Sequence, residues 1–244
     1  MSCNYYKRCF KSLMPKSIQT VDEYHGEKII VLACTDFNKT EYPKQSQRKR
    51  ILNDWIDFLR ANPDAIENLH CVTRMNQQLF DAICCQTNLI ELNIKWGVYP
   101  DLSKITNLQR LECLMLCAGA STKDISPIGE LIQLEALSLS TVGTHDYSPL
   151  SNLHKLKELG IHSGMDNVVK VNDLKFLYKL NELRNFSTSG FRLIDGDYSP
   201  VLSLDKLEFL SVNMPAYDYK IWNSKLAEHF SDIACNRHLD PFAH

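Results

Sequence analysis

Residues 124–139 read DISPIGELIQLEALSL, and the same pattern occurs five times in this chain of 244 residues. Each copy opens on an aspartate and carries aliphatic residues, mostly leucine, that lie three apart and then two apart. The intervals between successive opening aspartates are 23, 22, 27 and 24 positions, and those residues are Asp101, Asp124, Asp146, Asp173 and Asp197. A repeat of this length and spacing predicts a stack of coils, each with one strand and one short helical turn.

The spacing within one copy predicts how a coil folds. Side chains alternate between the two faces of a strand, so Leu137 and Leu139 are expected to point into the stack and Ser138 away from it. Leu131 and Leu134 are expected to cover the back of the coil on a helical turn. The Ser-Pro pair suits the cap and first residue of that turn, and the preceding aspartate can accept a backbone N–H within it.

The Asp-x-Ser-Pro turn followed by LxxLxxLxL resembles the short repeats of bacterial internalins and of the phosphatase-regulator subgroup of leucine-rich repeat proteins. This resemblance covers about residues 66–214 and implies an α/β leucine-rich repeat solenoid. In such a solenoid a curved parallel sheet forms the concave side, and short helices or 3₁₀ turns form the convex side. The resemblance also implies a non-catalytic protein that binds other proteins on its concave face. The asparagine that normally closes each repeat is replaced by Gly97, Gly119, Val142, Gly164 and Phe191.

The segments outside the clear repeats predict caps for the two ends of the stack, because terminal coils expose an apolar cross-section. Residues 1–65 are expected to form an N-terminal cap, with a hairpin of 17–21 and 28–34, a polar linker at 38–50, and an amphipathic helix from Ile51 to Leu59. The repeats occupy 66–214, with a fuller helix at 76–85 and an extended loop at 164–172. Residues 215–244 form a C-terminal helical cap, its helix predicted at 220–234.

A partner is expected on the concave face, at the variable positions between the buried leucines. Small, weakly polar side chains occupy the middle of this face, and larger groups lie toward its ends, where aromatic and methionine anchors favour an interface. The loops 96–99 and 217–219 adjoin it. The predicted protein-binding residues are Glu91, Asn93, Lys95, Trp96, Met115, Ser138, Glu158, His162, Phe209 and Met214.

Composition argues against several classes of function. The net charge of −2 and the pI near 6.4 indicate no general affinity for nucleic acid. The longest apolar run, residues 29–34, is too short for a membrane span. Nine cysteines without framework spacing predict free thiols and a cytoplasmic protein, although export by a signal-less route gives the same composition. One carboxylate per coil supplies too few ligands for a calcium ladder, so we expect no metal and no cofactor.

No catalytic constellation is predicted. Among the histidines only His162 falls on the concave face in this register, and no cysteine is placed beside a base. The leading hypothesis is therefore a non-enzymatic binding scaffold of the inhibitor, immunity or adaptor type. Two alternatives remain open at this point: a host-directed bacterial effector that uses the repeats for targeting, and a cysteine-dependent enzyme, which is the weakest of the three.

Overall fold

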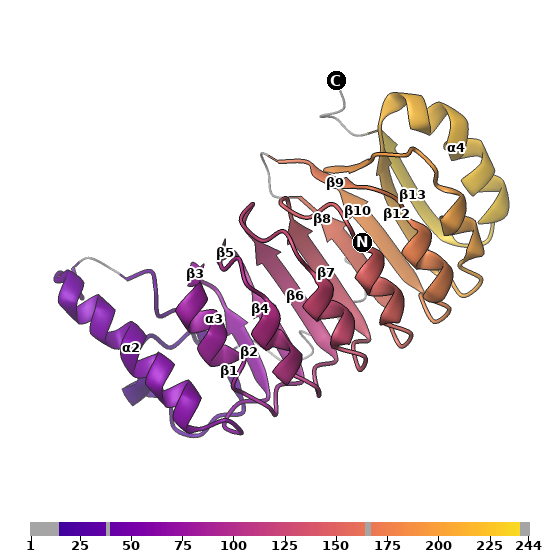
Figure 1. Cartoon of the computed structure of the whole chain (residues 1–244). Coiled ribbons are helices and arrows are strands. Elements are labelled where there is room, and N and C mark those ends of the chain that lie inside the picture. The colour runs from indigo at the N-terminus through magenta and orange to yellow at the C-terminus, as the bar shows by residue number, and fades with distance from the viewer. Residues whose placement is uncertain (1–14, 38–39, 164–166, 240–244) are drawn as a thin grey trace.

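The computed structural model describes residues 15–37, 40–163 and 167–239. The strands stack in one direction, from helix α2 (Gln45–Ala61) at one end to helix α4 (Ala216–His229) at the other (Figure 1). Nine strands form one sheet in which every neighbouring pair is parallel. In sheet order these strands are β1 (Ile29–Leu32), β2 (Asn68–Cys71), β4 (Glu91–Ile94), β6 (Cys113–Ala118), β7 (Ala136–Thr141), β8 (Glu158–His162), β10 (Asn185–Ser189), β12 (Phe209–Met214) and β13 (Ala234–Leu239).

Each of the five clear repeats carries a 3₁₀ helix of five residues behind its strand. These helices are η2 (Ser103–Asn107), η3 (Ser126–Glu130), η4 (Ser148–Asn152), η5 (Lys175–Lys179) and η6 (Ser199–Ser203). In all five repeats the opening aspartate accepts the backbone N–H two residues further on, at 2.8 to 2.9 Å, as predicted. The serine is the first residue of the turn and not its cap, because the carboxylate already accepts that amide.

The leucines of the repeat fill one continuous core between the sheet and the helical turns. Leu114 and Leu116 of β6 are fully buried, and Leu137 and Leu139 of β7 are at most 1% exposed. The pairing register places these positions side by side on consecutive strands. The predicted earlier coil is also present, because Ile66, Leu69 and Cys71 are buried in the same core.

The N-terminal segment differs from its prediction in two respects. Residues 17–21 and 28–34 form no hairpin, because Ile18 bridges Leu32 in parallel and the 3₁₀ turn η1 (Val21–Glu23) lies between them. This segment instead extends the stack, since β1 pairs in parallel with β2. Helix α2 begins at Gln45, so the second part of the predicted polar linker, residues 45–50, belongs to the first turns of that helix.

Helices α2 and α3 cover the back of the first coils. In α2 an apolar side contacts the core through Ile51, Trp55, Ile56 and Leu59, which are all buried. The indole Nε1 of Trp55 donates to the carbonyl oxygen of Gln19 at 2.8 Å. The predicted helix behind the second coil is α3 (Gln77–Ile83), and its first turn is capped by the Asn76 side chain, which accepts from the Leu79 amide at 2.9 Å.

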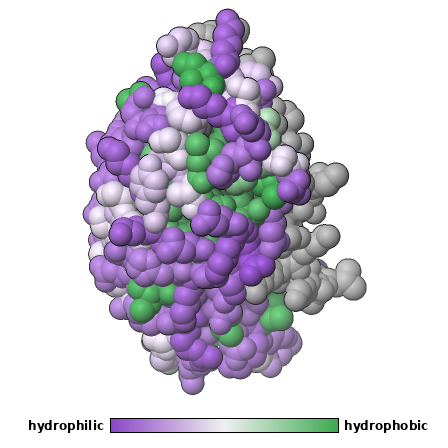
Figure 2. Space-filling model, turned by 90° about the vertical axis from the view of Figure 1, so that its right-hand side faces the viewer, coloured by the Kyte–Doolittle hydropathy of each residue, from purple (hydrophilic) through white to green (hydrophobic). Residues whose placement is uncertain are grey.

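The C-terminal segment ends in a strand that the sequence did not predict. Helix α4 begins and ends earlier than predicted, at Ala216 and His229, and β13 then pairs in parallel with β12. Leu226 and Phe230 are buried, and the half-buried Trp222 donates from Nε1 to the carbonyl oxygen of Gly196 at 2.9 Å. Seen from this end, the surface is largely hydrophilic, with hydrophobic side chains in separate patches (Figure 2).

Two short sheets join the loops that follow the main strands. β3 (Met75–Asn76) pairs with β5 (Gly97–Val98), and β9 (Val169–Val171) pairs with β11 (Phe191–Leu193). β9 lies within the predicted extended loop of the 27-residue interval between Asp146 and Asp173. A Cβ at Gly97 would lie 2.4 Å from the Met75 carbonyl oxygen, so the position that usually holds asparagine here permits close stacking of two coils.

Threonines supply part of the hydrogen bonding that an asparagine ladder would provide. The hydroxyl of Thr122 donates to the carbonyl oxygen of Tyr99 at 2.9 Å, and that of Thr144 donates to the carbonyl oxygen of Thr122 at 3.3 Å. Both threonines are buried. Successive coils are therefore linked by side-chain hydrogen bonds that begin three to four residues beyond each strand.

Candidate functional site

The face of the main sheet opposite the helical turns, called the concave face below, carries its side chains in rows. One row runs across six consecutive strands, and register pairs join its members: Asn93, Met115, Ser138, Gly160, Ser187 and Ser211. All of them except Gly160 are half-buried. Because five of the six are small or short and polar, the row forms a low surface that a partner's backbone can approach.

The predicted site residues do not all lie on this surface. Asn93, Met115, Ser138, His162 and Phe209 are half-buried on it, whereas Glu91 and Glu158 face it but are only 5% and 6% exposed. Met214 was placed wrongly. It continues the inward positions Leu210 and Val212 and is fully buried in the core, because β12 keeps its alternation to its last residue.

Lys95 and Trp96 lie beyond the end of β4 and are exposed. Trp96 is 47% exposed, and the guanidinium carbon of Arg74 lies 5.2 Å from its ring centroid. The adjoining Val98 is 45% exposed, and at the other end of the sheet Tyr217 is 75% exposed. The predicted loop 96–99 therefore presents large apolar side chains to solvent, whereas residues 217–219, also predicted as a loop, belong to the first turn of α4, which exposes Tyr217.

A buried pair of ionisable side chains on the concave face was missed by the sequence analysis. His70 lies between the inward residues Leu69 and Cys71, so it faces the same side as Asn93, its register neighbour. Its Nε2 atom is 3.3 Å from Oε1 of Glu91, and the Asn68 side chain donates to Oε2 of Glu91 at 3.0 Å. The position of His70 between two leucine-frame residues was the signal that would have identified it.

Burial shifts the pKa values of this pair toward the neutral forms. Burial raises the pKa of the Glu91 carboxyl to about 7, against the opposing effect of the Asn68 hydrogen bond. Burial also lowers the pKa of the His70 imidazole. Burial therefore disfavours the ionised forms of both groups, and Oε1 of Glu91 has no hydrogen-bond partner among the described residues.

His162 is held by a second feature of the face. Its Nδ1 atom lies 3.0 Å from the hydroxyl of Ser189 on the neighbouring strand, and burial lowers the pKa of its imidazole. The ring covers Gly160, because a Cβ at that position would lie only 2.3 Å from Nε2. The absence of a side chain at Gly160 is what lets the imidazole lie flat on the sheet.

The cysteines with described side chains are all free thiols. Burial raises the pKa of Cys34 to about 12 and raises the pKa values of Cys71 and Cys84 as well. A protonated thiol is a poor nucleophile, so these three buried residues are unsuited to covalent catalysis at neutral pH. Within the described residues no group of three or more histidine, cysteine, aspartate or glutamate side chains is arranged to hold a metal ion.

Two cavities lie along the edge of the sheet where the main strands end. The C-terminal cavity has a volume of about 560 Å³ and lies between residues 192–197 and the start of α4. Its lining includes Asp195, Asp197 and Asp218 together with Arg192, and burial raises the pKa of Asp218. The N-terminal cavity, of about 510 Å³, lies between α2 and the loops after β1 and β2.

Comparison with solved structures identifies the architecture. Internalin C2 of Listeria monocytogenes superposes with a TM-score of 0.53 and 20% sequence identity, over 75% of this chain and 77% of the internalin. The chain has the leucine-rich repeat fold. The resemblance of its repeats to those of internalins is thereby confirmed for the fold. Internalin F of the same organism is also 20% identical, over 72% of this chain and 54% of that one, with a TM-score of 0.48.

No family model and no curated protein matches the chain. The likeness is therefore one of leucine-rich repeat architecture, and the residues of the concave face have to be interpreted on their own chemistry. Among the described residues, no helix of this leucine-rich repeat protein is both long and apolar enough to span a bilayer.

Proposed function

We propose that this protein is a non-enzymatic scaffold that binds another protein along its concave face and the adjoining loops, as an inhibitor, an immunity protein or an adaptor. The observation that carries the proposal is the row from Asn93 to Ser211, where small and polar side chains are aligned across six strands. Such a row offers side-chain hydrogen-bonding groups at regular intervals and little steric hindrance. It suits an extended or helical segment laid across the strands.

The size of the face argues that the loops take part. Six strands about 4.8 Å apart span ~24 Å, and four residues at about 3.3 Å span ~13 Å. The resulting footprint of roughly 300 Å² is well below the ~800 Å² per partner of a standard stable interface. Trp96 and Val98 at one end and Tyr217 at the other extend the surface with exposed apolar groups. We therefore propose an interface that includes the loop after β4 and the first turn of α4.

The same proposal assigns different roles to the repeats and to the two terminal segments. Residues 66–214 provide the concave face, and the segments 1–65 and 215–244 close the two ends of the stack and border that face. A cytoplasmic location is in keeping with the nine cysteines of the chain and with the free state of the described ones. Neither the effector alternative nor the cysteine enzyme is favoured by a specific contact in the described residues.

The experiment compares partner capture by matched variants. Met115→Lys combined with Ser138→Lys adds two long cations in the middle of the concave row, whereas Gln133→Lys adds one outside it, just before strand β7. Capture from lysate of the source cells, quantified by mass spectrometry, should enrich one protein that the concave variant loses at least tenfold and the control retains. The purified pair should then form a complex of fixed stoichiometry. Equal capture by both variants would remove the concave face from the proposal.

A further inference from the structure

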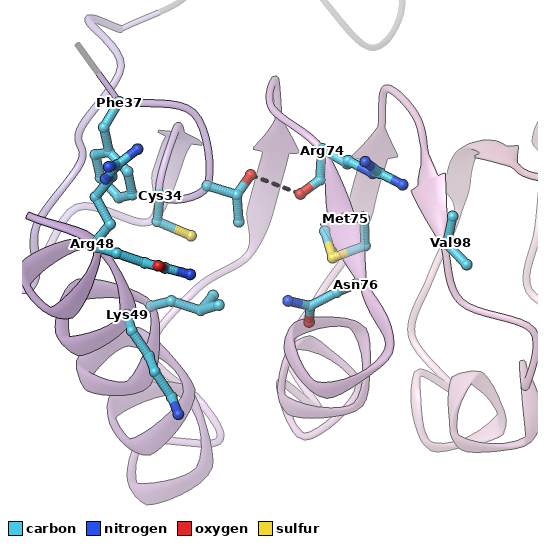
Figure 3. Close-up of a pocket in the computed structure, with 11 residues that line it drawn as sticks. Cys34, Phe37, Arg48, Lys49, Arg74, Met75, Asn76 and Val98 are labelled. Carbon is cyan, nitrogen blue, oxygen red and sulfur yellow. Dashed lines mark hydrogen bonds between the residues drawn. The ribbon is translucent and has the colours of Figure 1, made fainter. Parts of the chain in front are cut away.

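The N-terminal cavity has a composition that the concave face does not share. It is a groove lined by 11 residues from the end of β1, the first turns of α2 and the short β3–β5 sheet, and is called the N-terminal groove below. Its volume of about 510 Å³ is within the ~300–1,000 Å³ typical of sites that enclose a ligand or an inserted side chain. Figure 3 shows the sulfur atoms of Cys34 and Met75 directed toward each other across it.

The floor of this groove is apolar. Cys34 and Met75 are each 1% exposed and belong to the core, and burial keeps the Cys34 thiol protonated. Phe37 and Leu52 pack against that core from the sides, and Val98 borders the groove with 45% of its surface exposed. An apolar side chain placed here would contact carbon and sulfur atoms on several sides and would lose its contact with water.

The rim of the groove is cationic. Arg48 and Lys49 on α2 and Arg74 on the loop before β3 line it, and no lining residue is acidic. None of the three forms an ion pair within the part of the chain that the structure describes. In Figure 3 Arg48 and Arg74 lie on opposite sides of the opening, and Lys49 extends along α2. The charge is therefore spread around an apolar centre and is not focused on one point.

Each arginine makes one contact, which does not occupy all of its N–H donors. Arg48 donates from Nη2 to the Pro43 carbonyl oxygen at 3.3 Å, while its Nε atom is buried and has no hydrogen-bond partner among the described residues. Arg74 lies over the exposed ring of Trp96, which fixes the plane of its guanidinium without using its N–H groups. Trp96 also makes the groove continuous with the loop already proposed to contact the partner.

We infer that the N-terminal groove binds a segment of the protein partner in which one apolar side chain is flanked by carboxylates. The apolar side chain lies on the floor formed by Cys34 and Met75, and carboxylates on either side of it pair with Arg48 and Arg74. Guanidinium groups are suited to carboxylates because their donors match the two oxygens. This inference rests on the proposed function only in taking the ligand to be a protein, and it adds the chemistry of one segment of that protein.

The C-terminal cavity does not offer the same selection. Three aspartates and one arginine line it, so an acidic segment would be repelled there. The two ends of the sheet edge thus differ in sign, which orients a partner that carries an acidic segment.

The test uses the full chain labelled with ¹⁵N and synthetic pentapeptides as probes. Acetyl-Asp-Glu-Leu-Asp-Glu-amide should shift the backbone amide resonances of Thr35, Asn76 and Val98. Its leucine-to-serine version should bind at least fivefold more weakly, and acetyl-Lys-Lys-Leu-Lys-Lys-amide should leave these resonances unchanged. Arg48→Glu combined with Arg74→Glu should raise the dissociation constant at least tenfold. Lys170→Glu, an exposed cation on β9, should change it less than twofold.

Several outcomes would overturn the inference: no shift with the acidic peptide, equal binding of the serine version, or tighter binding of a 12-nucleotide single strand at the same residues. If the double variant does not fold, Lys49→Glu on the exposed surface of α2 should still weaken binding about threefold, and an unchanged constant would count against the inference. Met115→Lys with Ser138→Lys should leave peptide binding intact. Failure of the concave-face proposal is therefore separable from failure of this one.

Discussion

The middle coils and the end coils cover the back of the sheet with different elements. Between Asp101 and Ser203 each coil needs only a five-residue 3₁₀ turn, because it has a neighbour on both sides. At the ends the turn is replaced by α2, of 17 residues, and α4, of 14 residues. Both terminal helices carry a tryptophan, Trp55 or Trp222, whose Nε1 donates to a carbonyl of the adjoining segment. A coil with one neighbour thus buries a longer apolar element and anchors it by a hydrogen bond.

The largest expected effect comes from removing one of the two ends. Deletion of residues 220–244 takes away Leu226, Phe230 and the half-buried Trp222, which pack against the last repeat. At about 1.5–3 kcal/mol for each buried side chain, the loss is comparable to the ~5–15 kcal/mol net stability of a typical domain. We expect aggregation, or a melting temperature lowered by more than about 10 °C, measured by calorimetry and light scattering.

The control for this truncation is Lys225→Ala. The Lys225 ammonium lies 4.6 Å from the centroid of the Trp222 ring and is exposed, so its removal should cost less than about 1 kcal/mol. A truncated protein that stays monomeric and melts like the full chain would show that the terminal helix does not stabilise the stack. The end and middle coils would then differ in the type of helix behind the strand but not in its contribution to stability.

The next largest effect is expected inside the other end helix. Trp55→Ala empties a fully buried site and should cost about 3–5 kcal/mol in urea unfolding. Trp55→Phe retains most of the packing and loses the hydrogen bond to Gln19, and should cost about 1–2 kcal/mol. If the two variants were equally destabilised, the hydrogen bond and not the packing would hold α2 in place.

The Glu91–His70 contact, where the end coils meet the middle ones, should produce a pH-dependent effect. The folded-state pKa of Glu91, about 7, is above the unfolded value of about 4.3. Between these values the folded state binds the extra proton, so this residue makes the protein less stable as pH rises from about 4.3 to about 7. Glu91→Gln should therefore be more stable than the wild type at pH 8, by about 1 kcal/mol or more, and equal to it near pH 4.

The opposing titration of His70 is present in both proteins and largely cancels in their difference. Its lowered pKa makes stability increase with pH up to the unfolded value of about 6.5. Denaturant unfolding at four pH values from 4 to 8 measures the comparison. A difference between Glu91→Gln and wild type that does not change over this range would show that the Glu91 carboxyl is not protonated at neutral pH in the folded state.

The smallest effect is expected in a middle coil. Asp124→Ala removes the acceptor of the Ser126 amide and should cost about 1 kcal/mol at pH 7. The hydrogen bonds from Ser126 lower the pKa of Asp124, so this stabilisation is present above the unfolded value of about 3.9 and is lost as pH falls through the lower folded value. The melting curves of variant and wild type should converge as pH falls below this lowered folded-state pKa. If Asp124→Ala lowered the free energy of unfolding as much as Trp55→Ala does, the 3₁₀ turns would contribute as much to stability as the terminal helices.

The repeats were predictable because their pattern is local. Leucines such as Leu114 and Leu116 recur in fixed register, and an aspartate opens each of the five clear repeats. Each repeat therefore predicts the same strand and turn as its neighbours. The end segments carry no such marker. The bridge of Ile18 with Leu32 and the strand β13 depend on pairing with a neighbouring coil, and an isolated β-rich run does not reveal whether it pairs in parallel or folds back.

The site was less predictable than the fold. Strand alternation placed Asn93, Met115 and Ser138 on the concave face, but the length of β12 decided that Met214 points inward. His70 was missed because its coil lacks the opening aspartate that marks the five clear repeats. The N-terminal groove lies between residues more than 60 positions apart, from Cys34 to Val98, and only the stacking of the first three coils brings them together.

The fixed interval of the repeat makes the length of the molecule adjustable in single steps. From Asp124 to Asp146 the chain advances 22 positions and returns to the same point of the next coil. A second copy of residues 124–145 inserted before Asp146 would begin with an aspartate at the place where Asp146 now follows β7. It would end directly before Asp146, which opens the turn of η4. Because coils contact mainly their neighbours, the insertion would lengthen the sheet by one strand spacing, about 4.8 Å, without a new kind of junction. Gene duplication within this segment is therefore a route to longer binding surfaces built from the same turn.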